Sequence, residues 1–321
     1  MQLRHLRYFV KIVEAGSFSR AAATIHVAQP ALSQQIGELE RELAVSLLHR
    51  SARGVRATAA GEVLYREASA ILRQMEQLPG IVRSAGGEIE GIVSLGMSST
   101  LASFLAGPFL EACRAALPKV KLRLITGDSL MLKSRIEAGT LDLAAVFEDE
   151  PIAGFVRHPL FRQRLYLIRR EPLPSNGAVI SLSELAARPL ILAAQPNVSR
   201  TLLDRVFAGA NLVPNMVAEA DVLSSMLSAV QAGIADTILP KGDFSDVAGH
   251  GALFPVLIEP PIYLTACVLC SSERPLGQAA ERVCDLIGRH VLEQMQSTAP
   301  AGAEWVGAEP AISDAYRRIP S

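Results

Sequence analysis

The chain contains 321 residues, of which 50% are hydrophobic and 20% are charged, a composition typical of a soluble globular protein with more than one core. Its formal net charge of −1 is unevenly distributed, because residues 1–60 carry 8 Lys and Arg against 4 Asp and Glu, whereas residues 61–321 carry 23 against 28. A basic end on a nearly neutral chain suits phosphate binding by that end alone. No apolar run approaches the roughly 18–20 residues that span a bilayer, so we expect a cytoplasmic protein without a membrane helix or secretory signal.

Residues 17–43, SFSRAAATIHVAQPALSQQIGELEREL, predict two short helices that meet at a tight corner. At about 100° per residue, the second helix has one apolar and one polar or small face. The apolar face consists of Leu32, Ile36, Leu39 and Leu43. The opposite face consists of Pro30, Ser33, Gln34 and Gly37. Uncharged hydrogen-bonding groups on an outward face are typical of a helix-turn-helix whose second helix reads DNA.

The next segment predicts a basic hairpin. Residues 47–58 alternate in polarity, with Arg53 and Gly54 at the turn and Arg50 and Arg56 on the arms. Taken singly, each piece has a plain alternative, since helix pairs are common and exposed arginines are usually only solvated. The ordered series of two helices, a polar reader and a basic wing favours DNA binding.

A long helix is predicted after the hairpin. Its apolar residues are spaced 4, 3, 4, 3 and 4 apart, at Leu64, Ala68, Ile71, Met75, Leu78 and Val82. This heptad seam predicts pairing with a second copy of the chain, and the alternative is a helix docked on its own domain. Pro79 lacks a backbone N–H, so we expect the helix to bend or end near Leu78.

From about residue 90, strand and helix patterns alternate in βαβ order, which predicts a parallel sheet, and a second such group starts near residue 163. Two α/β lobes of this kind form a ligand cleft at the carboxyl ends of their strands. Ser98, Ser99 and Thr100 end the first strand, where hydroxyls and free amides can hold a carboxylate; the alternative is that one of them only caps the next helix. Asp128, beside Ser129 after the second strand, would repel an anion unless it is a cap.

The remaining chemistry-bearing residues predict no active site. The cysteines lie in apolar contexts, at Cys113, Cys267, Cys270 and Cys284. The closest two are three residues apart in a predicted strand and point to opposite faces, so neither a metal nor a redox role is expected. The sequence contains no phosphate loop, metal-ligand spacing or nucleophile elbow, and its six histidines are scattered. We therefore expect neither an enzyme nor a cofactor.

Residues 17–61 resemble the winged helix-turn-helix of the LysR-type transcriptional regulators nearly position by position. The resemblance continues through ALPKVKL, EAGTLDLAAV and QAGIADTILP and covers residues 1 to about 296. The stretches MQLRHLRYFVKIVEAGS and LYREASAILRQMEQ are similar to the nitrogen assimilation control regulators within that family. Ala235 stands where the family commonly has glycine, which puts close backbone approach to a ligand there in doubt.

This resemblance implies a homodimer formed through the linker helices, usually paired into a homotetramer. The resemblance also implies that this oligomer binds double-stranded promoter DNA, with RNA polymerase as a further possible partner. It implies in addition a small-molecule effector, bound in a cleft similar to that of periplasmic binding proteins. The implied contacts to base edges or nearby backbone are Gln29, Pro30, Ser33 and Gln34, with Arg53 in the minor groove. The implied phosphate contacts are Arg4, Arg20, Arg50 and Arg56. The implied effector contacts are Ser98, Ser99, Thr100, Asp128, Ser129, Gln195, Pro196 and Asn197.

The predicted fold class is α/β with an all-α-type winged helix-turn-helix, a long linker helix and a two-lobed regulatory domain. The expected domains are DNA-binding at 1–58, linker at 59–89, regulatory at 90–296 and a flexible tail at 297–321. Lobe I comprises 90–161 and 268–296, and lobe II comprises 162–267. An effector-independent architectural regulator is the alternative function. The sequence leaves open the operator, the effector, the direction of regulation and any role of Trp305.

Overall fold

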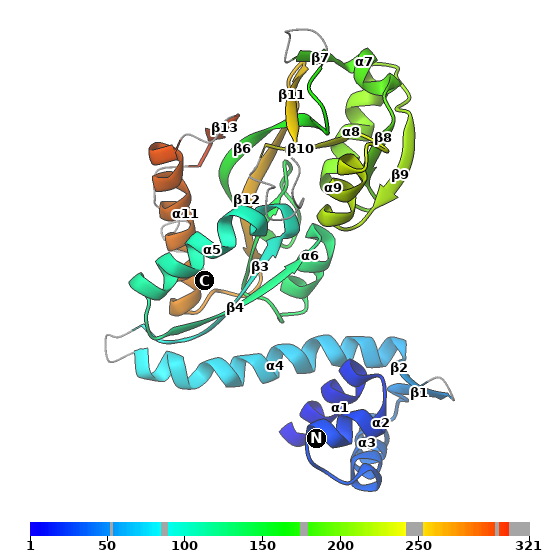
Figure 1. Ribbon diagram of the computed structural model, residues 1–321. Coiled ribbons are helices and arrows are strands. Elements are labelled where there is room, and N and C mark those ends of the chain that lie inside the picture. Colours follow the sequence, from blue (N-terminus) through cyan, green and yellow to red (C-terminus); the bar gives the residue numbers. More distant parts are fainter. Residues whose placement is uncertain (52–53, 85–88, 174–178, 242–252, 299–301, 308–321) are drawn as a thin grey trace. The chain divides into compact units, whose positions relative to one another are not determined.

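The computed structural model describes residues 1–51, 54–84, 89–173, 179–241, 253–298 and 302–307 (Figure 1). The chain divides into two compact units. The first comprises Met1–Ile92 with Arg135–Leu141, and the second comprises Val93–Ser134 with Asp142–Ser321.

The amino-terminal unit is a helical domain with a small hairpin. Its elements are α1 (Leu3–Ala15), α2 (Phe18–Thr24), α3 (Gln29–Leu43), β1 (Leu48–Ser51), β2 (Gly54–Ala57) and α4 (Ala59–Ser84). The predicted apolar face of α3 is confirmed at Leu32, Ile36 and Leu39, which are fully buried among side chains of α1 and α2. Leu43, the last residue of the helix on the same face, is 38% exposed, so the buried part of this face ends at Leu39.

The hairpin is fixed to the helices through its backbone. The N–H of Val55 donates to the carbonyl of Gly16 at 2.9 Å, where α1 ends. Gly54 has φ +120°, and a Cβ there would lie 2.7 Å from the oxygen of Gly16. Only glycine fits this approach, and the β1–β2 pairing confirms the predicted hairpin.

The long helix α4 uses its apolar seam in two ways. Ala68 is 0% exposed because it packs with Leu64 against Leu6 and Val10 of α1, so this part of the seam serves its own domain and not a second copy. Farther along, the seam is solvent-exposed within the chain. Its exposed residues are Ile71, Met75, Leu78 and Val82. The helix continues through Pro79 to Ser84, so the proline does not end it.

The second unit is built on a nine-stranded sheet in the described part of the chain. Its first elements are β3 (Gly91–Ser98), α5 (Ser99–Ala116), β4 (Val120–Gly127), α6 (Ser129–Glu137), β5 (Leu143–Phe147) and β6 (Phe155–Arg169). The next are β7 (Val179–Ser181), α7 (Leu182–Ala187), β8 (Leu190–Ala193), α8 (Val198–Gly209), β9 (Met216–Ala220) and α9 (Leu223–Gln231). The last are β10 (Thr237–Pro240), β11 (Phe254–Glu259), β12 (Tyr263–Ser271), α11 (Gln278–Thr298) and β13 (Ala303–Trp305).

The long strand β6 joins the two lobes of this unit. Its first part pairs with β12, and its last residues pair with β10 and β11. The expected parallel pairing holds for β3 with β5 and for β8 with β9, but β12 and β6 are antiparallel. The sheet is therefore mixed, because the chain crosses from lobe I to lobe II and back along extended strands. Helices α5 and α11 lie side by side on lobe I (Figure 1).

Residues 302–307 dock on the sheet, so the prediction of a loose tail is wrong for them. Strand β13 pairs antiparallel with β6, and the N–H of Arg164 donates to the carbonyl of Gly302 at 2.8 Å. Glu304 forms an ion pair with Arg162, and Trp305 packs against the main core. The remainder of the predicted tail, residues 308–321, lies outside the described residues.

Candidate nucleic-acid interface and ligand cleft

The predicted reading residues lie together on one outward face of α3. Gln29, Pro30 and Gln34 are exposed, and Ser33 is half-buried. Three of them already have hydrogen-bond partners within the unit. The hydroxyl of Ser19 donates to Gln29 Oε1 at 3.0 Å, and Arg50 Nη1 donates to Ser33 Oγ at 3.0 Å. The Nε2 of Gln34 donates to Glu38 Oε1 at 3.0 Å. The reading face is thus ordered by contacts with α2, β1 and its own next turn.

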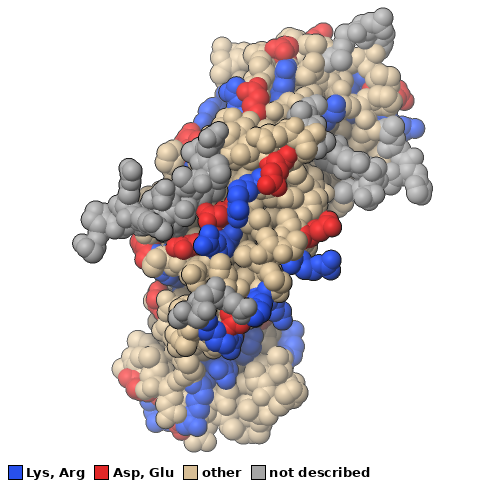
Figure 2. Space-filling view, turned by 90° about the vertical axis from the view of Figure 1, so that its left-hand side faces the viewer, with Lys and Arg blue, Asp and Glu red and all other residues tan. Residues whose placement is uncertain are grey.

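The basic side chains assigned to phosphates lie at the surface of the same unit. Arg4, Arg20 and Arg56 are exposed. Arg50 lies with its guanidinium carbon 4.5 Å from the ring centroid of Phe18, a cation–π contact that holds it beside α3. In the space-filling view, Lys and Arg outnumber Asp and Glu on the visible side of the amino-terminal unit, whereas both signs are mixed on the second unit (Figure 2). Arg53 lies outside the described residues.

In the second unit, six of the eight predicted effector residues line a small cavity of about 90 Å³. Its polar wall includes Ser98, Ser99, Thr100, Asp128, Ser129 and Asn197. These residues belong to the amino-terminal ends of α5, α6 and α8, where unpaired backbone N–H groups favour anions. Its apolar wall includes Phe147, Leu192, Leu203, Ile238 and Leu264. The structure thus brings these six predicted residues together around one cavity, and their contact with an effector stays a prediction.

Ser98 is the distinctive group of this cavity. It is 8% exposed, its side chain makes no capping hydrogen bond to α5, and its Oγ has no hydrogen-bond partner in the structure. The capping alternative, which covered any one of the three residues, is therefore removed for Ser98. Asp128, in contrast, accepts the N–H of Met131 at 2.8 Å and so caps α6. Asn197 likewise caps α8 by accepting the N–H of Arg200 at 3.2 Å.

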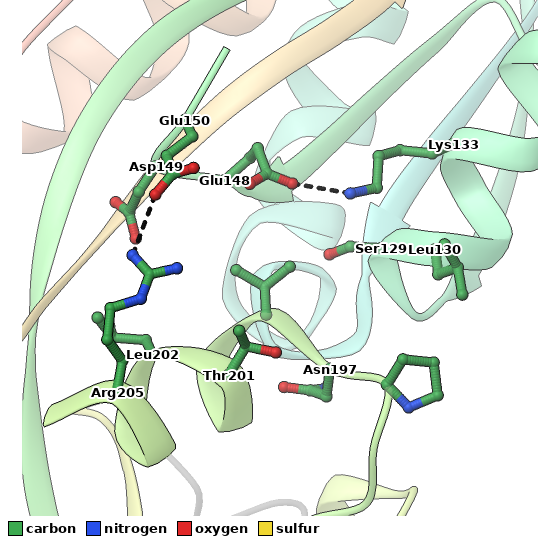
Figure 3. Close-up of a pocket in the computed structure, with 12 residues that line it drawn as sticks. Ser129, Leu130, Lys133, Glu148, Asp149, Glu150, Asn197, Thr201, Leu202 and Arg205 are labelled. Carbon is green, nitrogen blue, oxygen red and sulfur yellow. Dashed lines mark hydrogen bonds and ion pairs between the residues drawn. The ribbon is translucent and has the colours of Figure 1, made fainter. Parts of the chain in front are cut away.

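A second cavity of about 230 Å³ adjoins the first and shares Ser129, Asn197 and Val198 with it (Figure 3). Two ion pairs line it, Lys133 with Glu148 at 2.8 Å and Arg205 with Glu150 at 3.0 Å. The second pair joins lobe I to lobe II, because Glu150 follows β5 and Arg205 lies on α8. No sequence motif marks these four charged residues, which meet only through the fold. One signal was available: Glu148 follows a buried strand, as Ser98 ends one.

Three residues considered for the cleft occupy other positions. Gln195 donates to Asp204 at 2.8 Å and lines neither cavity, and Pro196 lines only the second one. Gln195 directly precedes the loop that enters α8, so its neighbours in sequence reach the cleft while its own side chain packs along the helix. Ala235 is buried in the core of lobe II and lines neither cavity.

The cysteines are buried free thiols. Cys270 belongs to the main core, whereas Cys267, an odd number of residues away along β12, lies beside Arg157. Burial raises the pKa of Cys267 to about 12 and raises the pKa of Cys284 well above its usual value. Thiols of this kind stay protonated and unreactive near neutral pH. Within the described residues, no three His, Cys, Asp or Glu side chains are grouped as metal ligands, and no helix is long and apolar enough to cross a membrane.

Comparison with known proteins assigns both units. Residues 3–62 match the bacterial regulatory helix-turn-helix protein, lysR family, and residues 86–292 match the LysR substrate binding domain. The nitrogen assimilation regulatory protein nac of Klebsiella aerogenes is 34% identical over 302 residues, covering 92% of this chain and 98% of the relative. The protein of the same name from Escherichia coli K12 is 35% identical over 250 residues, covering 78% and 81%.

Solved structures show the same fold. A full-length OxyR variant from Pseudomonas aeruginosa superimposes with a TM-score of 0.69 at 21% identity, covering 97% of this chain and 99% of that one. Full-length CbnR complexed with its target DNA superimposes with a TM-score of 0.68 at 23% identity, covering 90% and 100%. The winged helix-turn-helix, the two-lobed α/β unit and both family matches together show that the chain belongs to the LysR family, as a DNA-binding transcriptional regulator with an effector-binding domain and not an enzyme.

Proposed function

We propose that this regulator reads promoter DNA with two or more copies of α3 and that a small anionic effector in the Ser98 cavity modulates this binding. The observation that carries the DNA-reading part is the single exposed face on which Gln29, Ser33 and Gln34 are each held by an internal hydrogen bond. Side chains ordered before binding lose less conformational entropy when they contact bases.

Base reading follows from the chemistry of this face. A glutamine amide offers a donor and an acceptor side by side, which complement adenine N7 and N6 in the major groove. We assign this role to Gln34 and Gln29, with Pro30 and Ser33 packed against the groove. Arg4, Arg20, Arg50 and Arg56 would contact phosphates and add affinity without sequence choice, and Arg53 would reach the minor groove.

Symmetric binding requires a dimer, which we place on the exposed part of the α4 seam. The apolar side chains of Ile71, Met75, Leu78 and Val82 are 40–65% exposed. A second copy of α4 would bury them and present two α3 helices to one duplex. Pairing of two such dimers gives a tetramer, in the cytoplasm and in contact with RNA polymerase at the promoter. Relatives named for nitrogen assimilation suggest nitrogen-metabolism genes as targets.

For the effector, the buried and unpartnered Ser98 Oγ carries the proposal. A carboxylate there would accept from this hydroxyl and from the free N–H groups that start α5. The apolar wall would contact a short carbon chain, since the cavity of about 90 Å³ holds only a few non-hydrogen atoms. In the adjoining cavity four of the five charged side chains form ion pairs, and the fifth, Asp149, accepts the N–H of Thr265, so this cavity suits a polar end of the ligand that carries no negative charge.

The DNA-reading proposal is tested with Gln34→Ala. Genome-wide binding sites define the operator, and fluorescence anisotropy then compares that operator, its single base-pair variants and random DNA. We expect Gln34→Ala to lose discrimination of about 1–3 kcal/mol at one base pair, the usual value for a bidentate contact. Equal losses on operator and random DNA would refute base reading by Gln34.

The effector proposal is tested by thermal shift against panels of small carboxylates. A binder stabilises the native protein by RT ln(1 + [L]/Kd), and Ser98→Ala should abolish this shift. Ser103→Ala, on the outer side of the same helix with its hydroxyl bonded to the carbonyl of Thr100, is the matched control and should keep it. No shift with any carboxylate in the panel would favour an effector-independent regulator.

A further inference from the structure

A chain of hydrogen bonds links the core of the DNA-binding unit to its reading face. It begins at His5, which is 6% exposed on α1 and whose Nε2 lies 3.1 Å from Gln35 Oε1. The Nε2 of Gln35 then donates to Glu38 Oε2 at 2.9 Å. The other oxygen of Glu38 accepts from Gln34 Nε2 at 3.0 Å. One carboxylate thus holds two glutamines, one facing inward and one facing the DNA side.

The chemistry of the groups fixes the direction of every bond in this chain. An ionised carboxylate only accepts, so both glutamines must turn their NH₂ groups toward Glu38. The Oε1 of Gln35 therefore faces His5, whose Nε2 must be the donor. The orientation of the Gln34 amide is consequently set by Glu38 and, through Gln35, by a buried side chain.

The other acidic residues of α1 and α3 have different partners. Glu14 pairs with Lys11, and Glu40 accepts the backbone N–H groups of Leu47 and Leu48. Glu42 pairs with the chain's amino terminus. Among the described residues, Glu38 accepts from two neutral amides on the helix that would enter the groove. A negative charge placed there opposes phosphate binding, so its contribution to the regulator must come from something other than affinity.

We propose that Glu38 is a positioning residue that determines base specificity by fixing the amide of Gln34; this rests on the proposed reading of bases by Gln34. With one N–H held by Glu38, Gln34 presents its second N–H and Oε1 outward as a donor and acceptor pair. That pair matches adenine N7 and N6. Guanine offers two acceptors, N7 and O6, and would place O6 against Oε1. Without Glu38 the amide turns freely and tolerates guanine.

The test compares Glu38→Gln with Glu42→Gln in the full-length protein. Both variants remove one negative charge from α3, but only Glu38→Gln replaces the acceptor with a group that bonds either end of the Gln34 amide. Anisotropy measures the affinity for the operator, for operators with A·T replaced by G·C at each position, and for random DNA. Both variants should bind random DNA more tightly by a similar factor. Glu38→Gln alone should lower the A·T over G·C preference at one position by about tenfold, the lower part of the range for one such contact.

Two outcomes separate the possible failures. If Gln34→Ala changes no base preference, the proposed reading by Gln34 is wrong. If Gln34→Ala changes it while Glu38→Gln and Glu42→Gln behave alike at every position, only the role of Glu38 is refuted. In the double variant, Glu38→Gln should have no further effect on preference once Gln34 is alanine, because the two residues act as one unit. Additive losses in the double variant would also overturn the proposal.

Discussion

Replacement of Gly302 by alanine should weaken the docking of β13 on β6, the long strand that joins the two lobes. Gly302 has φ +79°, and a Cβ there would collide with Tyr166 Oη and lie 3.0 Å from Arg164 Cβ. The left-handed backbone costs an L-residue roughly 1–2 kcal/mol, and overpacking adds about 1–3 kcal/mol. The segment is held by the β13–β6 pairing and by three further backbone hydrogen bonds to Leu160 and Arg164, each worth about 0.5–1.5 kcal/mol. Together the two strain terms give about 2–5 kcal/mol, which acts against the docking of the segment on β6.

Gly154→Ala is the matched control, because Gly154 has φ +85° but no neighbouring atom within 4 Å of the position that a Cβ would take. It carries the backbone strain without the collision. Trp305 in β13 is the chain's single tryptophan, so its fluorescence reports this segment alone. We expect Gly302→Ala to show red-shifted emission and stronger acrylamide quenching in buffer, with Gly154→Ala like the parent. Parental emission and quenching in Gly302→Ala would show that the segment does not dock as described.

Met75→Arg should weaken dimerisation by about 100-fold or more, because an unpaired charge buried in an interface costs several kcal/mol. Sedimentation of this variant should show monomers. The neighbouring Gln74→Arg, which lies off the seam, is the control and should remain dimeric. An unchanged oligomer in Met75→Arg would place the interface elsewhere. Burial raises the pKa of Cys267 to about 12 from 9.0, so the unfolded chain loses this proton first as pH rises. The thiol's contribution to stability is therefore complete below pH 9 and declines between pH 9 and 12. Urea unfolding at about pH 8 and about pH 10, on either side of the ordinary thiol pKa, should show a smaller loss for Cys267→Ala than for the parent, and equal losses would contradict a buried neutral thiol.

The fold of the DNA-binding unit could be predicted from its sequence, because helix periodicity and capping depend on residues close together in the chain. The 3.6-residue period placed Leu32 and Ile36 inward and Gln34 outward, and Ser17 caps α2 as its sequence position suggests. The contact of Glu38 with Gln34 could also be predicted from the sequence, since the two residues have the i,i+4 spacing at which helical side chains meet. The contribution of Gln35 and His5 could not be predicted from the sequence, because it depends on how α1 packs on α3.

The regulatory unit was less predictable wherever distant segments meet. An Ala-, Gly- and Pro-rich composition suggested a loose tail, yet residues 302–307 are ordered because they satisfy the free edge of β6, a partner about 140 residues earlier. Ala68 is a second example, because its heptad position predicted a dimer contact, whereas the packing of α4 on α1 within the chain already covers it. Strand alternation predicted two lobes, but the antiparallel crossing of β6 and β12 depends on the path of the chain between them.

Glu38 can determine specificity although its hydrogen bonds contribute little to stability. A side-chain pair on an exposed helix is worth only about 0.2–0.5 kcal/mol, too little to select the residue for folding. The orientation of the Gln34 amide depends on a different quantity, the free-energy difference between its two possible orientations. In one position the NH₂ group faces the carboxylate, and in the other Oε1 faces it, with two acceptors in contact and no proton between them. The penalty of the second position adds to the gain of the first, and each step of about 1.4 kcal/mol in that gap changes the population ratio tenfold. A weak surface contact thereby becomes a strong preference for one amide orientation, and so for one base.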